Sequence, residues 1–136
     1  MYFDTHAHYD DSKFDDDRHE IIQKVRREGV SNIVNPSSSL KSIKKTIKLC
    51  EKYEFIYGAV GIHPHDCSVI NDEVLQKVSE AATKTGIVAI GEIGLDYYYD
   101  NSPREQQKHW FAAQINLAVE LDLPIIVHDR EAHQDV

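Results

Sequence analysis

The sequence has few features of exported, membrane-spanning or disulfide-bonded proteins. Its two cysteines, Cys50 and Cys67, lie far apart and match no Cys-x-x-Cys metal or redox spacing. No apolar run approaches the roughly 18 residues that a membrane helix needs. The first residues carry neither the basic start nor the apolar core of a secretory signal. We therefore expect a cytoplasmic protein with no membrane partner and two reduced thiols.

Positive charge is also scarce. The chain has 15 lysine and arginine residues against 23 aspartate and glutamate residues, and its formal net charge is -8 at pH 7. This balance argues against a protein that coats duplex DNA through a broad basic face, because such binding neutralises many phosphates. It is compatible with a nuclease that holds a few phosphates through bound cations, because such a site itself needs anionic and imidazole ligands.

Short β-like runs alternate with longer helical patterns along the chain. Apolar spacing and stop signals predict helices over Arg18–Glu28, Leu40–Tyr53, Asp72–Thr83 and Pro103–Leu121. Strands are predicted over Tyr2–His6, Asn32–Val34, Ile56–Gly61, Ile87–Ile90 and Ile125–Val127, the last two as buried runs. Strict alternation of this kind makes parallel sheets with helical crossovers in a single α/β domain over residues 1–136. The alternation alone fits either a doubly wound sheet or a barrel.

Four of the five predicted strands are followed by histidine or glutamate: His6 and His8, His63 and His65, Glu92, and His128. His6 and His8 are two residues apart in an extended segment, so both imidazoles share one face. Glu92 follows four apolar residues, and a carboxylate at the end of a buried strand is costly unless it is paired or bound to metal. The carboxyl edge of a parallel sheet is where catalytic groups gather. Imidazole and carboxylate together suit Zn²⁺, Mn²⁺ or Co²⁺, whereas a pure Mg²⁺ site favours oxygen ligands.

Three other stretches carry weaker signals. The acidic run Asp10–Asp17 is expected to form a solvated loop, and the lysines between Lys41 and Lys48 are expected to form the solvated face of a helix. Tyr97–Tyr99 follow Glu92 closely and have two interpretations of equal weight. They either form a structural loop or stack on a nucleobase.

Four motifs together resemble the TatD-type DNases of the amidohydrolase superfamily. They are D-T-H-x-H at Asp4–His8, G-x-H-P at Gly61–Pro64, G-E-x-G-L-D at Gly91–Asp96 and V-H-x-R at Val127–Arg130. Their order and spacing cover the whole chain. The resemblance implies a (β/α)8 TIM-type barrel and metal-assisted hydrolysis of DNA phosphodiester bonds, as a 3′-to-5′ exonuclease on single-stranded ends.

The resemblance also implies roles for individual residues. His6 and His8 are expected to bind one divalent ion, Glu92 to bridge two ions and take part in catalysis, and His128 to bind the second. The two ions are expected from Zn²⁺, Mn²⁺, Mg²⁺ and Co²⁺. Contacts with the DNA substrate are expected from His63, His65, Asp96 and Arg130.

The family barrel has about 250 residues, so these 136 residues are expected to form about five of its eight βα units. The family's later metal-binding histidine and its water-activating aspartate have no counterpart here. We therefore expect little activity from the chain as it stands, and self-association through open barrel edges. Two alternatives stay open. One is an amidohydrolase-type enzyme acting on another ester, such as aminoacyl-tRNA, and the other is an inactive metal-binding fragment.

Overall fold

A computed structural model describes residues 1–136 and contains one parallel sheet. Its strands are β1 (Tyr2–Asp4), β2 (Val30–Pro36), β3 (Ile56–Val60), β4 (Ile87–Asp96) and β5 (Ile125–Arg130). They lie in the order β1-β2-β3-β4-β5, so every strand pairs in parallel with its sequence neighbour. A doubly wound sheet reverses its strand order at a switch point, and this sheet does not. Of the two folds compatible with the sequence, the strand order therefore favours the barrel over the doubly wound sheet.

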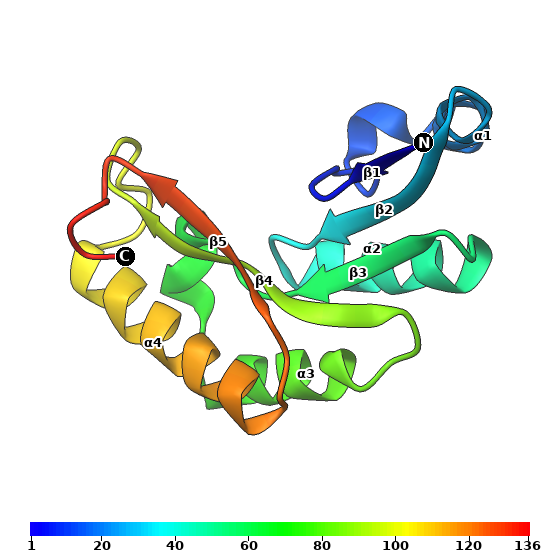
Figure 1. Cartoon of the computed structure of the whole chain (residues 1–136). Helices are drawn as coiled ribbons and strands as arrows, with labels where there is room; N and C mark the ends of the chain where they lie inside the picture. Colours follow the sequence, from blue (N-terminus) through cyan, green and yellow to red (C-terminus); the bar gives the residue numbers. More distant parts are fainter.

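The helices lie outside the curve of the sheet (Figure 1). They are α1 (Arg18–Arg27), α2 (Leu40–Lys52), α3 (Asp72–Ala82) and α4 (Arg104–Glu120), with the short 3-10 helices η1 (Ser12–Phe14) and η2 (Pro64–Val69). The sheet curls between its two edge strands, which makes an α/β half-barrel of four βα units and a fifth strand, of the (β/α)8 TIM type. None of the helices combines the length and the apolar character needed to cross a membrane.

The main core lies between the sheet and the helices that cover it. Seventeen buried apolar residues form one cluster, in which Ile90 and Ile93 of β4 pack with Val78 of α3 and Phe111 of α4. A smaller cluster joins α1 and α2 to β2 and β3 around Ile33. Burial of one apolar stripe per helix explains why the helices begin and end within one residue of the positions predicted from the sequence.

Two buried glutamines of α4 fix the strand ends that lead into the site. Gln107 accepts a hydrogen bond from the backbone N–H of Asp96 at 2.8 Å and donates to its carbonyl at 3.1 Å. Gln114 forms the same pair of bonds with Ile62, at 2.8 and 3.2 Å. A buried backbone group needs such a partner, so α4 holds the carboxyl ends of β3 and β4 in register with each other.

The predicted strand ends were wrong at four of the five strands. β1 ends at Asp4, before His6, whereas β2 extends the predicted Asn32–Val34 at both ends. β4 continues from Ile90 to Asp96, and β5 continues from Val127 to Arg130. The ladder between β4 and β5 resumes after a register shift and runs to the pair Asp96 and Arg130. Backbone pairing therefore extends through polar residues that a hydropathy pattern treats as the end of the strand.

The prediction of a buried fifth strand was also wrong. Ile125 and Val127 are 39% and 38% exposed, because β5 has a neighbour on one side only. β1 is the other edge, where Tyr2 and Phe3 are 71% and 57% exposed. Unpaired strand edges are templates for pairing with another chain. Self-association through these edges stays a prediction from the sequence.

Gly94 permits the close approach of β4 and β5 behind the site. Its φ is +147°, and a Cβ atom built there would lie 2.0 Å from the carbonyl oxygen of His128. Any side chain at position 94 would push β5 away from β4 and would move His128. The close packing of β4 against β5 therefore requires glycine at position 94, the second glycine of the G-E-x-G-L-D motif.

We predict that Gly94→Ala lowers the free energy of unfolding by more than about 3 kcal/mol, because backbone strain adds to a clash with backbone. The matched control is Gly29→Ala, at a positive φ of +101° with no atom within 4 Å of the new Cβ. That control should lose only about 1–2 kcal/mol of backbone strain. Urea unfolding of the two variants checks this, and equal losses would contradict the clash.

Candidate metal centre

Glu92 lies at an irregular point of β4, where one extra residue interrupts the ladder with β5. Pairing passes from Ile90 opposite Ile125 to Ile93 opposite Val127. The backbone N–H of Glu92 donates to the carbonyl of Ser37 at 2.8 Å instead of joining the ladder. Bulges of this kind re-aim a side chain, and they are common beside active sites. Here the bulge turns the Glu92 carboxylate toward the histidines, although Glu92 is only 7% exposed.

The two carboxylate oxygens of Glu92 face imidazoles on opposite sides. Oε2 lies 3.3 Å from Nε2 of His6 and 3.5 Å from Nε2 of His8. Oε1 lies 2.9 Å from Nδ1 of His128. The two nitrogens of His6 and His8 are themselves 3.1 Å apart. The structure thus brings together the four side chains for which the sequence predicts a metal-binding role, from three separate segments of the chain.

A second group of side chains lies behind His128. Nε2 of His63 is 3.1 Å from Nδ1 of His128. Oδ2 of Asp96 lies 2.8 Å from Nε2 of His65 and 3.0 Å from Nε2 of His128. Asp96 is fully buried, and its hydrogen bonds fix the ring orientation of both histidines.

Two sets of three residues have ligand atoms close enough for one ion, within 4.8 Å of one another. The first set is His6, His8 and Glu92, and the second is His63, His65 and His128. The first set fits a divalent cation in chemistry, because two imidazoles and an ionised carboxylate converge from one side. In the second set, Nδ1 of His63 accepts a hydrogen bond from the backbone N–H of His65 at 3.2 Å. Neutral His63 then carries its proton on Nε2, which makes it a hydrogen-bond donor rather than a ligand.

The charges of the site are tightly coupled. Burial alone raises the pKa of Glu92, but hydrogen bonds with His128 and His8 and the other imidazoles outweigh it and hold that pKa well below its usual range. Burial likewise opposes the shift at Asp96, where the Tyr99 backbone N–H, His65 and His128 lower the pKa to about 2. Both carboxylates therefore stay ionised at neutral pH.

The histidines respond in opposite directions. The hydrogen bond with Glu92 raises the pKa of His8 and of His128 against the effect of burial. Burial, and then the charge of His128, lower the pKa of His63 to about 4. Glu92 thus favours the protonated forms of His8 and His128, and divalent cations would balance the same buried carboxylates.

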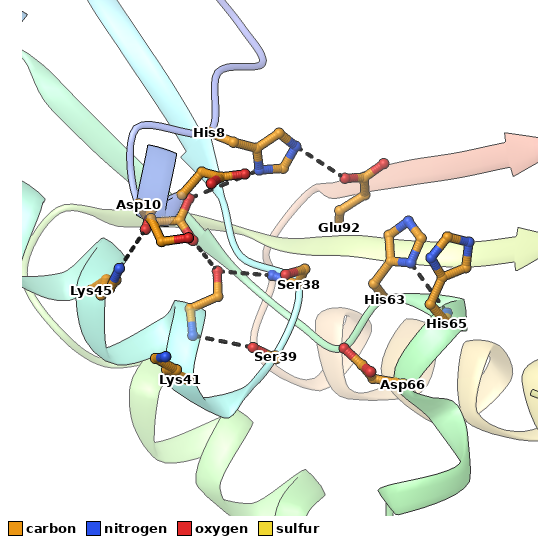
Figure 2. Close-up of a pocket in the computed structure, with 13 residues that line it drawn as sticks. His8, Asp10, Ser38, Ser39, Lys41, Lys45, His63, His65, Asp66 and Glu92 are labelled. Atoms are coloured by element: carbon orange, nitrogen blue, oxygen red, sulfur yellow. Dashed lines mark hydrogen bonds and ion pairs between the residues drawn. The ribbon is translucent and has the colours of Figure 1, made fainter. Parts of the chain in front are cut away.

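A polar cavity of about 480 Å³ opens beside Glu92 (Figure 2). Its lining has no hydrophobic residue and reaches from His8, His63 and His65 to the start of α2. Residues Ser38, Ser39, Lys41, Ser42 and Lys45 form that far wall. Lys41 is exposed, as expected for a solvated helix face, whereas the expectation was wrong for Lys45, which is half-buried and donates from Nζ to the Asp10 carbonyl at 3.0 Å. The sequence did carry a signal for this wall, because Ser38 and Ser39 directly precede α2.

Asp10 is a second residue that the sequence interpretation misplaced. It is 8% exposed rather than part of a solvated loop. Its carboxylate accepts hydrogen bonds from Asn35 at 3.0 Å and Ser42 at 2.5 Å, and lies 3.9 Å from Nδ1 of His8. Asp10 thus connects His8 to β2 and α2 (Figure 2). Its partners lie 25 and 32 residues away in the sequence, so no local pattern could have revealed them.

The model for the family described as TatD related DNase matches residues 3–136. The chain belongs to this family. It is 43% identical over 136 residues to YabD of Bacillus subtilis, an uncharacterized metal-dependent hydrolase, and covers 53% of that protein. It is 40% identical over 131 residues, 96% of the chain, to the 3′-5′ ssDNA/RNA exonuclease TatD of Cronobacter sakazakii, and covers 50% of that protein. The chain spans about half the length of the curated relatives it matches.

The structural comparison agrees with the family assignment. The crystal structure of the TatD homologue YjjV of Escherichia coli K12 superposes with a TM-score of 0.90 at 32% identity, over 98% of this chain and 52% of that one. A TatD-family hydrolase from Entamoeba histolytica gives the same TM-score at 26% identity, over 99% and 52%. The relatives are named as metal-dependent hydrolases and as nucleases, and the chain matches about half of each of them.

We predict that Glu92→Gln lowers the pKa of His128 and of His8 in metal-free protein. Their hydrogen bond with the carboxylate is the largest cause that raises each pKa, and burial, which lowers it, remains. In the variant both rings should therefore lose their protons at lower pH than in the wild type. NMR titration of the imidazole protons measures this directly.

His133 is the internal control. Its pKa is also raised by a carboxylate, but that carboxylate is Asp129, and the side chain of His133 is exposed. Its titration should be unchanged by Glu92→Gln. If His128 also kept its wild-type pKa, Glu92 would not be the charge that holds its proton.

Proposed function

We propose that this chain carries the metal-binding part of a two-metal phosphodiesterase that acts on single-stranded nucleic acid ends. The observation that carries the proposal is the Glu92 carboxylate, whose two oxygens face His6 and His8 on one side and His128 on the other. A carboxylate in that position suits a bridge between two divalent ions. Relatives such as the Cronobacter sakazakii enzyme are named 3′-5′ ssDNA/RNA exonucleases, and the proposal adopts the same direction of cleavage.

In this proposal His6, His8 and Glu92 would hold one ion, and Glu92 and His128 would supply ligands to the second. Zn²⁺, Mn²⁺, Mg²⁺ and Co²⁺ are the candidates, with imidazole ligands favouring Zn²⁺, Mn²⁺ and Co²⁺. When bound, such ions supply Lewis-acid polarisation of the phosphate and activation of water. Glu92 stays ionised because its surroundings hold its pKa below the usual range, so it is ready to bind cations at neutral pH.

The remaining residues act on the substrate. His63 is neutral at pH 7, since its pKa is about 4, and it can donate a hydrogen bond from Nε2 to a phosphate oxygen. Asp96 keeps His65 and His128 in place through its Oδ2 atom. The polar wall with Lys41 and Lys45 gives the neighbouring phosphates a hydrated, partly basic surface. Only two of the 15 lysine and arginine residues, Lys41 and Lys45, line the cavity, which also holds four carboxylates, so bound cations would have to supply most of the positive charge for an anionic substrate.

We predict that the protein shortens a single-stranded oligonucleotide labelled at its 5′ end when Mn²⁺ or Mg²⁺ is added, and that excess chelator stops the reaction. Because the chain spans about half the length of its relatives, the assay uses protein in excess over the strand. Glu92→Gln should slow cleavage by at least about 100-fold, since loss of a direct ligand exceeds the effect of losing an outer partner. His133→Gln, at an exposed turn, should leave the rate unchanged.

The same experiment separates the alternatives. D-aminoacyl-tRNA is assayed in parallel, and release of its amino acid without cleavage of the oligonucleotide would favour an ester hydrolase. Metal binding with neither reaction would favour a metal-binding fragment. Full activity in Glu92→Gln would remove the basis of the bridging role.

A further inference from the structure

Two tyrosines with half-exposed side chains lie at the edge of the candidate site. Tyr98 and Tyr99 follow β4 and are 53% and 52% exposed. Their rings meet edge to face, with centroids 4.8 Å apart and planes at 89°. The ring of Tyr99 also lies edge-on to His65, with a centroid distance of 5.4 Å. The aromatic pair therefore continues the histidine cluster outward.

Arg130 covers both rings from the neighbouring strand. Its guanidinium carbon is 4.1 Å from the ring centroid of Tyr98 and 4.7 Å from that of Tyr99. Arg130 joins none of the ion pairs that occupy nearby Arg104, which binds Asp100 at 2.8 Å. Because Arg130 and His128 are two residues apart on β5, they share one face of that strand. An unpaired guanidinium on the face of the candidate centre is suited to bind an anion.

The backbone beneath the two rings is fixed. Oδ1 of Asp96 accepts hydrogen bonds from the backbone N–H groups of Tyr98 at 3.1 Å and Tyr99 at 2.9 Å. The backbone N–H of Tyr97 donates to the carbonyl of Arg130 at 2.9 Å. The rings are thus presented in place before any ligand arrives, which reduces the entropy cost of binding.

Tyr97 shows what a structural tyrosine looks like in the same loop. It is half-buried, and its hydroxyl donates to Asp135 at 2.7 Å. Tyr98 and Tyr99 differ in exposing about half of their surface, and Tyr99 contacts His65, which lines the cavity. Exposed aromatic rings next to a free arginine are the elements from which single-strand binding surfaces are built.

We propose that Tyr98, Tyr99 and Arg130 form a stacking subsite for the terminal nucleobase of a single strand whose phosphate lies at the Glu92 site. This inference rests on the function proposed above. An unpaired base offers its face to the tyrosine rings, and Arg130 contacts the next phosphate toward the 5′ end of the strand. The base at a duplex end is already stacked and paired, so the subsite favours unpaired ends and tolerates any base.

The test compares two short single strands labelled with fluorescein at the 5′ end, one ending in adenosine at the 3′ end and one ending in an abasic nucleotide. Binding is measured by fluorescence anisotropy in the presence of chelator, so that it depends on neither metal nor turnover. Tyr98→Leu and Tyr99→Leu should each weaken binding of the adenosine-ended strand by about 5- to 150-fold. Neither should change binding of the abasic strand, and Tyr98→Phe should keep wild-type affinity.

Tyr2→Leu is the matched control, because Tyr2 is 71% exposed at the amino end of β1, on the opposite rim of the sheet. The proposal is overturned if the tyrosine variants bind both strands as the wild type does, or if they lose affinity equally for both, which would indicate a structural role. Failure of the proposed function shows separately, as absence of metal-dependent cleavage by the wild type despite base-dependent binding.

Discussion

A charged carboxylate buried in the middle of a strand is the constraint on which the rest of this structure depends. Glu92 is 7% exposed, and removing an unpaired carboxylate from water is costly. The fold offsets this cost by bringing imidazoles to both of its oxygens, from His6 and His8 on one side and His128 on the other. In the proposed enzyme, divalent ions would take over that role from protonated histidine.

Several features of the backbone follow from this requirement. The bulge in β4 turns Glu92 out of the ladder, and Gly94 lets β5 approach closely enough for His128 to reach it. Gln107 and Gln114 of α4 hold the ends of β3 and β4, so this helix helps to set the spacing of the residues that follow those strands. Asp96 then links the centre to its rim, because one oxygen holds His65 and His128 while the other holds the loop of Tyr98 and Tyr99.

The sequence predicted the helices well and the strand ends poorly, and both outcomes have physical reasons. A helix such as α3 buries one apolar stripe, and this stripe can be read from spacing alone. β4 and β5 continue through Glu92, Asp96 and His128, which are polar but have partners on other strands. Hydropathy ended those strands too early because it cannot show a distant partner. The same limit hid Asp10, whereas the histidine and glutamate positions were predicted because they recur at one edge of a parallel sheet.

The most direct test of the central claim is an anomalous difference map from crystals of this protein grown with Mn²⁺. The account predicts two peaks, one on each side of the Glu92 carboxylate, the first against His6 and His8 and the second against His128. A map without density at Glu92, or with Mn²⁺ bound only among His63 and His65, would contradict the account.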